Sequence, residues 1–470
     1  MLLLPPLAAG TVLRLWFLHS HAVVQGDSLF YGDIARNWLA HGIYGRTIEG
    51  TAGTLVAPTL ARLPGYPALI AACFFAFGTG HYTPLLYLQA FLDLGSCLLI
   101  AGLVQRVSGR RAAMAALVLA ALCPFTANYA AVALTETPSV FCVALSFYSL
   151  ASFQTTRRRL WLLPLAFSWS YAALLRPDGV LLGAASFAGL LLGGGNREDG
   201  ERSSRLRERF LAAVLCVFFA TLPFAVWTLR NLHTFHTFQP LVARDASDAG
   251  ETSTAGFDRW MKTWAIDFTA TSEIDWNADN NRLEIDLLPN RAFDSPGEYE
   301  ATRKLFADYN RGTTLTPPLD ARFAALAAGR VARHPLRYYV ELPMLRVADM
   351  WLRPRVEMLR VPVRWWQYHR HPAAACFALL YGLLNLAYLV MAAIGVVRWP
   401  RAAWRMLAAM LLYIVLRCLL LATLEGPETR YTLECFPVVI ALAAVGIAKR
   451  EGAGMGQDEA SRVPEHRRSL

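Results

Sequence analysis

Apolar runs of about 17–25 residues, the length of a membrane-spanning helix, recur along most of this sequence and restrict the folds it can adopt. Composition agrees with this reading, since 55% of the 470 residues are hydrophobic and only 17% are charged. An average soluble protein carries about 25% charged residues. The sequence therefore predicts an all-α integral membrane protein with about ten transmembrane helices.

Ten of these runs are expected to span the membrane. We interpret the first, 1–24, as a helix and not as a cleaved signal peptide, because Arg14 lies near its centre and no small-residue cleavage site follows. The other spans are expected at 84–105, 112–131, 137–154, 160–175, 179–194, 210–230, 373–397, 404–424 and 432–448. The run 66–77 is too short to cross, so we predict that it lies at the outer surface of the membrane.

Clusters of basic residues set the orientation of these spans. The clusters lie at 106–111, 157–159, 197–209, 398–405 and 449–450. With ten spans they all fall on one face, and the positive-inside rule makes that face cytoplasmic. They also account for the net charge of +10. We therefore expect contacts with membrane lipids and none with nucleic acid, since no basic face with interleaved aromatic residues is present.

The predicted spans divide the chain into three parts. Residues 1–231 are expected to form an N-terminal transmembrane core, with a first outer loop at 25–83. Residues 232–371 are expected to form an extracytoplasmic domain, and 372–470 the C-terminal transmembrane helices and a cytoplasmic tail.

The predicted outer domain is mostly helical. Helical periodicity is present at 298–310 and 320–333. The segment 335–353 mixes aromatic residues with arginines, which is typical of an amphipathic helix in the membrane interface. The polar stretch 245–281 is expected to be a loop.

Neither a disulfide nor a metal site is predicted. The eight cysteines lie within apolar segments, and no CxxC pair or Cys/His cluster is present. There is also no DxD motif, and no group of His, Asp and Glu has the spacing of metal ligands. We expect a protein without a cofactor, with a divalent metal ion left open as the alternative.

The first outer loop begins with a short helical pattern. Asp27 or Ser28 would cap a helix that places Phe30, Ile34 and Trp38 on one face, and Gly42 fits just past its end. Asp27 is then either a helix cap only or a carboxylate fixed beside the membrane as a general base.

Three further turns bring charged residues to the same outer face. They lie at 135–138, 176–179 and 425–431 and carry Glu136, Arg176 and Arg430. Each charge also has a purely structural explanation. Glu136 would be a helix cap, Arg176 a snorkelling helix end or the partner of Asp178, and Arg430 the partner of Glu425 or Glu428. Their convergence on one face nevertheless predicts a site there.

Several strings resemble one enzyme family. GDSLFYGDIARNWLAHGIYG at 26–45, followed by RLPGYP at 62–67, resembles the first luminal loop of GT-C membrane glycosyltransferases. More narrowly, it is similar to the superfamily of protein O-mannosyltransferases and lipid A aminoarabinose transferases, glycosyltransferase family 39. LTETP, LRPDG and ETRY at the three turns also resemble family motifs. The resemblance covers 1–231 and 372–449 but hardly touches 232–371.

The resemblance implies a reaction at the outer face of the bacterial cytoplasmic membrane. A polyprenyl-phosphate sugar would be the donor, and a hydroxyl of a lipid, glycan or protein the acceptor, with inversion at the anomeric carbon. Asp27 would be the catalytic base, and Glu136 would position the acceptor or the sugar. The donor phosphate would be bound by Arg62, Arg176, Arg430, Tyr66 and Tyr431, because guanidinium groups match phosphate oxygens.

Two other functions remain open from the sequence. A glycan polymerase or ligase would have a similar architecture but use a diphosphate-linked lipid donor. A transporter or flippase would place ionisable residues deep in its spans, and Arg14, Asp93 and Arg417 are possible cases. An ion pair between Arg14 and Asp93 would make these two structural.

Overall fold

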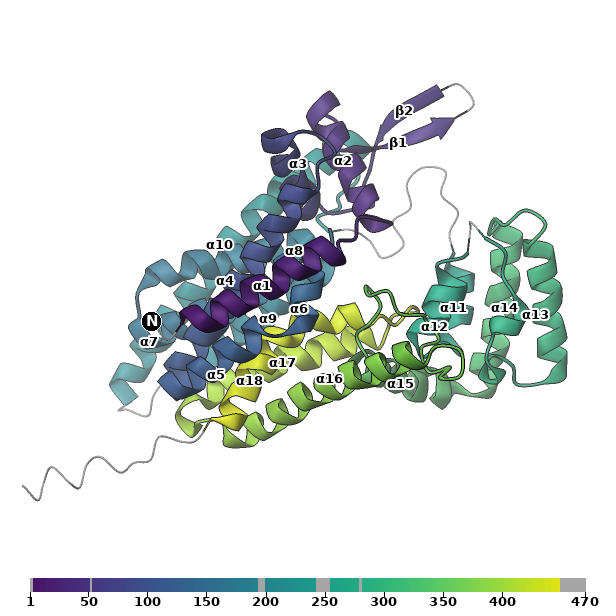
Figure 1. The fold of residues 1–470 in the computed structure, drawn as a ribbon. Helices are drawn as coiled ribbons and strands as arrows, with labels where there is room; N and C mark the ends of the chain where they lie inside the picture. The colour runs from purple at the N-terminus through teal and green to yellow at the C-terminus, as the bar shows by residue number, and fades with distance from the viewer. Residues whose placement is uncertain (1–2, 51–52, 193–198, 242–253, 279–280, 449–470) are drawn as a thin grey trace, which may run out of the picture.

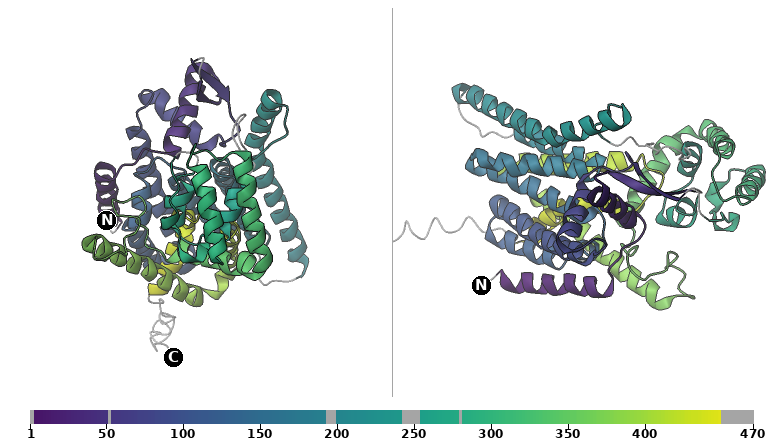
Figure 2. Two further views of the ribbon diagram at one scale, coloured as in Figure 1. Left: turned by 90° about the vertical axis from the view of Figure 1, so that its right-hand side faces the viewer. Right: turned by 90° about the horizontal axis from the view of Figure 1, so that it is seen from above.

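The protein, seen in a computed structural model, is described over residues 3–50, 53–192, 199–241, 254–278 and 281–448. These residues form eighteen α-helices and a two-stranded sheet (Figure 1). The long helices form one bundle, and the shorter helices α11 to α14 lie beyond one end of it (Figure 2).

Within the described residues, every run that the sequence predicts as a span is helical over most of its length. The bundle helices are α1 (Leu4–Ser20), α4 (Thr83–Ser108), α5 (Arg110–Ala121), α6 (Pro124–Tyr129), α7 (Glu136–Thr156), α8 (Leu162–Leu175), α9 (Val180–Leu192), α10 (Asp199–Phe235), α16 (Pro372–Arg398), α17 (Trp404–Leu421) and α18 (Phe436–Ile447). The predicted run 112–131 forms two of them, α5 and α6. The short run 66–77 forms α3 (Gly65–Phe77).

The all-α membrane class is confirmed, apart from one small sheet. Five stretches of the described chain are long and apolar enough to cross a membrane: Thr83–Ser108, Arg207–Phe235, Pro372–Arg398, Arg401–Leu421 and Thr429–Ile447. The shorter apolar helices include α3 and α9. The count of ten spans and the division into three parts therefore stay predictions.

Helix α18 lies at the centre of the bundle, and every residue from Phe436 to Gly446 is buried. Its backbone meets that of α16 directly. A Cβ atom on Gly395 would lie 1.8 Å from the carbonyl oxygen of Leu442, and one on Gly446 would lie 2.3 Å from that of Met391. Small residues permit such close approach of helices in lipid. The segment just before α18 is thus held on the best-packed element of the fold.

A buried ion pair joins α1 to α4. Arg14 donates from Nε to Asp93 Oδ2 at 2.9 Å and from Nη1 to the carbonyl oxygens of Gly10 and Ala121 at 2.9 and 2.7 Å. Both charged side chains are at most 2% exposed. Each charge is therefore compensated within the bundle, so neither residue needs a role in transport to explain its position.

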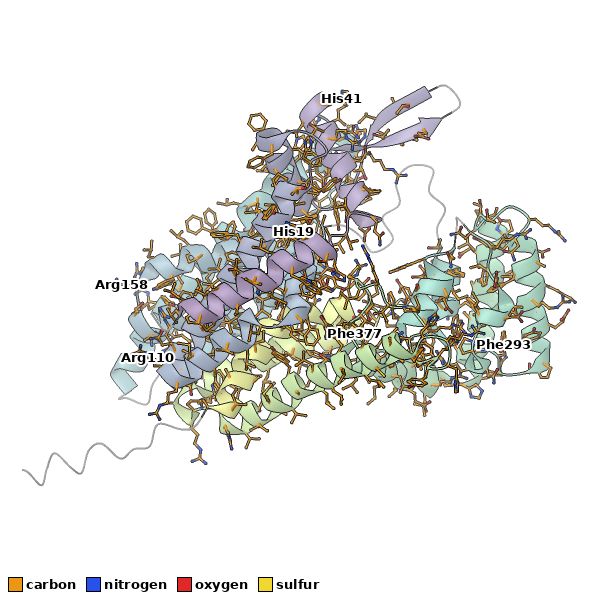
Figure 3. The ribbon with its side chains drawn as sticks, in the orientation of Figure 1. His19, His41, Arg110, Arg158, Phe293 and Phe377 are labelled. Carbon is orange, nitrogen blue, oxygen red and sulfur yellow. The ribbon has the colours of Figure 1, made fainter. Side chains whose placement is uncertain are left out.

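Two arginines identify one end of the bundle. Arg110 and Arg158 lie at the end where α1 begins, whereas His41 and Phe293 lie at or beyond the opposite end (Figure 3). The arginine-rich turns after α4 and α7 thus share one end, as the sequence predicts. The first outer loop and α11 to α14 share the other, which we call the outer end.

The first outer loop contains a hairpin that the all-α prediction misses. Strands β1 (Gly45–Gly50) and β2 (Gly53–Pro58) pair antiparallel, with Gly45 opposite Pro58. Asp33 anchors the hairpin to helix α2 (Asp27–His41), because its carboxylate accepts from the Thr47 amide at 2.7 Å and from the Thr47 hydroxyl at 2.8 Å. Arg230 of α10 donates to the carbonyl oxygens of Tyr44 and Thr59 at the base of the hairpin.

The ends of α2 confirm one predicted cap and correct the other. Gly42 ends the helix in the left-handed conformation with φ 68°, as expected. At the start, the cap residue is Gly26, with φ 54°, and Asp27 is already the first helical residue. No side chain caps this end. The alternative that Asp27 serves only as a helix cap is therefore wrong.

Helices α11 (Ala255–Lys262), α12 (Phe268–Ala270), α13 (Pro296–Tyr309) and α14 (Pro317–Arg333) surround a separate core. That core includes the fully buried Trp260 and Trp264. The predicted helices 298–310 and 320–333 are confirmed as α13 and α14. The predicted loop 245–281 is wrong where α11 and α12 form, because its apolar residues fill this core; 245–253 and 279–280 lie outside the described residues.

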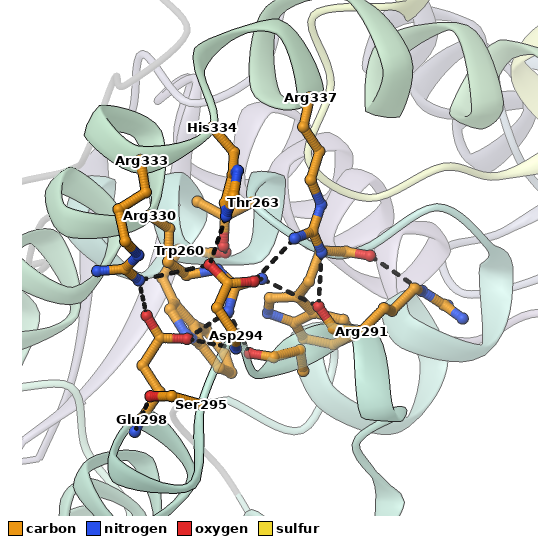
Figure 4. A network of polar contacts seen from close by, with 12 residues as sticks. Trp260, Thr263, Arg291, Asp294, Ser295, Glu298, Arg330, Arg333, His334 and Arg337 are labelled. Atoms are coloured by element: carbon orange, nitrogen blue, oxygen red, sulfur yellow. Dashed lines mark hydrogen bonds and ion pairs between the residues drawn. The ribbon is translucent and has the colours of Figure 1, made fainter.

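A network of ion pairs connects α13 and α14 (Figure 4). Asp294 contacts Arg330 at 3.3 Å and Arg337 at 2.8 Å, and Glu298 contacts Arg330 at 2.7 Å and also Arg333. Burial raises the pKa of Asp294, but these guanidinium groups outweigh it and the net pKa lies below the usual value. The network ties α13 and α14 to the segment that leads back to the bundle.

The predicted amphipathic segment 335–353 is helical, with a wide turn at Arg337–Glu341 followed by α15 (Leu342–Leu352). One face carries Arg346, whose Nη1 donates to the carbonyl oxygens of Lys262 and Ala265 at 3.1 Å. The other face exposes apolar side chains, among them Leu336, Tyr339 and Met344. The helix is confirmed, and its position in a membrane interface stays a prediction.

Candidate active site

A cavity of about 500 Å³ opens at the outer end of the bundle. It forms where the start of α2, the segment after the hairpin, the turns before α7 and α9, the end of α17 and a 3₁₀ turn, η8 (Thr429–Cys435), meet. Its lining is Asp27, Tyr31, Ala61, Arg62, Leu63, Leu134, Thr135, Glu136, Leu175, Arg176, Pro177, Asp178, Val180, Leu181, Leu420, Thr423, Leu424, Arg430 and Tyr431.

Six of the seven residues that the sequence proposes for the site line this cavity. They are Asp27, Arg62, Glu136, Arg176, Arg430 and Tyr431. The exception is Tyr66, which is fully buried behind Tyr31 and donates to Gln89 Oε1 at 2.7 Å. Its hydroxyl is used inside the bundle, so the predicted contact of Tyr66 with a donor phosphate has no support in this structure.

Asp27 lies between two cations. Its Oδ1 accepts from Arg62 Nη2 at 2.9 Å, and its Oδ2 lies 3.9 Å from Arg430 Nη2. Burial raises the pKa of Asp27, but the two guanidinium groups outweigh it, so the net pKa lies below the usual value. The side chain remains 37% exposed. Asp27 is therefore ionised at neutral pH and open to a molecule in the cavity.

Glu136, the first residue of α7, is almost fully buried at 1% exposure, yet neither carboxylate oxygen has a hydrogen-bond partner. Its nearest charges are Arg176 Nη1 at 3.5 Å and Arg430 Nε at 3.8 Å. A buried carboxylate without a hydrogen bond is costly, and such groups are rare unless a ligand or water completes them. Glu136 therefore offers two acceptor oxygens at the cavity wall.

Arg430 is held in η8 by its neighbours. Its Nε lies 2.7 Å from Glu428 Oε2, and Tyr431 Oη donates to Glu428 Oε1 at 2.7 Å. The ring of Tyr431 in turn lies against Arg176, with the guanidinium carbon 5.1 Å from the ring centroid. The ion pair of Arg430 with Glu428, foreseen as the purely structural explanation, is thus present together with its approach to Asp27 and Glu136.

Arg176 follows α8 and lies near two further carboxylates. Its Nε lies 3.3 Å from Asp178 Oδ1 and 3.5 Å from Glu434 Oε1. The first of these ion pairs was foreseen, but Glu434 was missed. It lies just inside the last predicted span, and an acidic residue in that position was a signal that could have drawn attention.

Part of the cavity lining is apolar. It consists of Val180 and Leu181 of α9, Leu420 of α17, and Leu424, which follows that helix. Val180 is 45% exposed, so this wall is accessible from outside the bundle. The cavity thus combines a charged floor with a hydrocarbon-like side between two helices.

No metal site is evident in the parts of the chain that the structure describes. Among them, no group of three or more His, Cys, Asp or Glu residues is placed to hold an ion. Independence from metal remains a prediction about the reaction.

Comparison with known proteins places this architecture. Residues 61–227, which are 167 of the 470, match the model of the dolichyl-phosphate-mannose-protein mannosyltransferase family. The apo oligosaccharyltransferase of Archaeoglobus fulgidus aligns over 94% of this chain and 49% of its own length, with a TM-score of 0.50 at 12% identity. The chain has the GT-C fold. This confirms the predicted GT-C fold, and the family match agrees with the predicted resemblance over part of the chain.

Two further structures align with this GT-C chain at lower scores. ArnT from Cupriavidus metallidurans aligns over 94% of this chain and 76% of its own, with a TM-score of 0.39 at 17% identity. AglB from Archaeoglobus fulgidus was solved with an inhibitory peptide and a dolichol-phosphate. It aligns over 95% of this chain and 49% of its own, with a TM-score of 0.49 at 12% identity. The chain spans about half the length of the archaeal enzymes. No curated protein matches its sequence.

Proposed function

We propose that this GT-C chain is an inverting glycosyltransferase. It moves a sugar from a polyprenyl-phosphate donor to an acceptor hydroxyl on the outer face of the bacterial cytoplasmic membrane. The observation that carries this proposal is the composition of the cavity: an ionised Asp27, three guanidinium groups and an apolar wall share one space.

The cations suit a lipid phosphate. Arg62, Arg176 and Arg430 line the same cavity, and the leaving group of the proposed reaction is a phosphate that gains negative charge as its bond to the sugar breaks. Fixed guanidinium groups stabilise that charge without reorganisation. The apolar wall of α9 and α17 gives the polyprenyl chain a path toward the bilayer.

Asp27 acts as the general base in this proposal. The acceptor oxygen forms a bond to the anomeric carbon while the bond from that carbon to the phosphate oxygen breaks. The electron pair leaves with the phosphate, and the hydroxyl proton passes to Asp27. A donor phosphate that engages Arg62 also draws it from Asp27 Oδ1, so that donor binding frees the base. Glu136 accepts a hydroxyl of the sugar or the acceptor.

The proposed orientation rests on the positive-inside rule. If the end with the arginine-rich turns is cytoplasmic, the cavity at the other end faces the periplasm or the exterior. A sugar carried on a lipid phosphate is available there without a nucleotide, so we propose that the reaction needs no metal ion. Loss of transfer on chelation, with recovery on adding a divalent ion, would refute this point.

A deletion strain provides the test. Mass spectrometry of its lipids and glycoproteins should reveal a missing sugar, which the wild-type gene restores. Asp27→Asn should fail to restore it at normal protein levels, since the amide accepts no proton. Asp33→Asn is the matched control on the same helix, because Asp33 serves the hairpin, and it should restore the sugar. Restoration by Asp27→Asn would overturn the assignment.

A diphosphate-linked donor is the second candidate, because three arginines offer enough donors for two phosphates. Competition distinguishes the two. If the donor carries one phosphate, undecaprenyl phosphate should inhibit transfer at least as strongly as undecaprenyl diphosphate. Stronger inhibition by the diphosphate would favour a polymerase or ligase.

A further inference from the structure

Arg417 is a fully buried cation in α17 that does not line the cavity. A charge inside a membrane helix is expensive and needs partners. Arg417 has three: it pairs with Asp178 Oδ2, its Nη1 lies 3.1 Å from Glu434 Oε2, and its Nη2 donates to the carbonyl oxygen of Tyr431 at 2.6 Å. All three partners belong to the turn before α9 or to η8, the segments that form the charged floor.

Two of these partners also hold Arg176. Asp178 Oδ1 and Glu434 Oε1 lie 3.3 and 3.5 Å from its Nε, while the second oxygen of each carboxylate contacts Arg417. Arg176, Asp178, Arg417 and Glu434 therefore form a closed ring of alternating charge, with two cations and two anions. Arg176 is the only cation of the ring that faces the cavity.

We propose that Arg417 is a positioning residue, which sets the orientation and the free charge of Arg176. With Arg417 present, each carboxylate of the ring is shared, and the Nε edge of Arg176 is anchored while its Nη1 points toward Glu136 and the cavity. Without Arg417, both carboxylates have Arg176 as their remaining guanidinium in the ring. They then compete with a ligand phosphate for it.

The bond to Tyr431 extends the same role to η8. Arg417 fixes the backbone at Tyr431, next to Arg430, so two of the three cavity cations depend on it. The inference rests on the proposed function, since it assumes that these cations bind the donor phosphate.

Arg14 supplies the comparison that separates positioning from stability. It is also fully buried and paired with a carboxylate, Asp93, but its contacts are within α1, α4 and the end of α5. None of its hydrogen-bond partners lines the cavity. Its removal should therefore cost stability without changing the affinity for phosphate.

The experiment measures the Kd of undecaprenyl phosphate for the full-length protein in detergent, together with its thermal unfolding. Arg417→Met should weaken binding by roughly tenfold or more, the scale of one charge-assisted hydrogen bond. Arg417→Met combined with Glu434→Gln should recover most of the affinity for the lipid, because the ring then keeps one cation, Arg176, and one anion, Asp178. Arg14→Met should unfold at a lower temperature and bind the lipid as tightly as the wild type.

Unchanged affinity in Arg417→Met would overturn the inference, as would a double variant no better than the single one. Where Arg417→Met does not fold, Arg417→Lys decides, since it keeps the charge but cannot reach three partners; it should bind more weakly, and wild-type affinity overturns the inference. A folded wild-type protein that fails to bind undecaprenyl phosphate would contradict the proposed function itself.

Discussion

Arg62 Nη2 lies 2.9 Å from Asp27 Oδ1, which joins the segment after the hairpin to the first residue of α2. The guanidinium carbon also lies 4.9 Å from the centroid of the Phe30 ring. Arg62 is therefore held by two residues of α2, Asp27 and Phe30. One of them, Asp27, is the carboxylate that we propose as the base. In the proposed reaction, Arg62 would serve both the donor phosphate and the catalytic carboxylate.

Removing Arg62 should affect binding and pH dependence together. Arg62→Met should raise the Kd of undecaprenyl phosphate by roughly tenfold. It should also raise the pKa of Asp27, because burial then meets less opposition from positive charge. Activity that requires ionised Asp27 is lost as pH falls through that pKa, so the acid limb of the pH–rate profile should move to higher pH. If the acid limb does not move, the reaction rate does not depend on the ionisation of Asp27.

Glu136 should matter for turnover and not for phosphate affinity. Glu136→Gln removes a negative charge beside Arg176 and Arg430, so undecaprenyl phosphate should bind as tightly or more tightly. Transfer should nevertheless fall by roughly tenfold or more, because a positioned acceptor for a hydroxyl is lost. Thr137→Val, at the next buried residue, is the control and should keep the rate. Parallel losses of affinity and rate would point to a structural role.

The pair of Arg14 and Asp93 should contribute stability alone. Asp93→Asn leaves Arg14 buried with its charge uncompensated, a change that costs about 3–5 kcal/mol in proteins. The unfolding temperature should fall, and transfer should persist at temperatures where the variant is folded. A variant with wild-type stability and no activity would instead favour a transport role for these charges.

The carboxylates of α11 and of the turn at Thr271–Asp275 make stability depend on pH. Burial first, and then the charges of Asp258, Glu425 and Glu428, raise the pKa of Asp275 to about 7. Because this folded pKa lies above the ordinary value of about 3.9, the stabilisation from a protonated Asp275 is lost as pH rises toward 7.

Asp275→Asn should therefore unfold at a higher temperature than the wild type at pH 8, with a smaller difference at pH 5. Glu273→Gln is the neighbouring control. Glu273 pairs with Arg364 at 2.8 and 2.6 Å, so its loss should lower stability at both values of pH. A gain of equal size at pH 5 and pH 8 in Asp275→Asn would exclude titration of this carboxylate as the cause.

Much of the fold was accessible from local sequence. Each apolar run forms a helix because a backbone in hydrocarbon must satisfy its hydrogen bonds within the segment. The hairpin at β1 and β2 was missed, since its two short strands depend on Asp33 and Arg230 from two helices. Likewise α11 was missed because it has only 8 residues and lies within a polar stretch, although Phe257, Trp260 and Met261 share one face.

For the site, the sequence by itself predicted which residues share one end, because the order of the apolar runs and the clusters of basic residues divide the turns into two sets. The sequence could not decide which of these charged residues pair with one another. The contact between Asp178 and Arg417 joins positions 239 residues apart, and it exists only because α17 packs against α9. The same packing closes the ring around Arg176, and the packing of α3 against α4 turns Tyr66 toward Gln89 inside the bundle. Hydropathy can be read from each segment alone, whereas these contacts depend on how segments distant in the chain pack side by side.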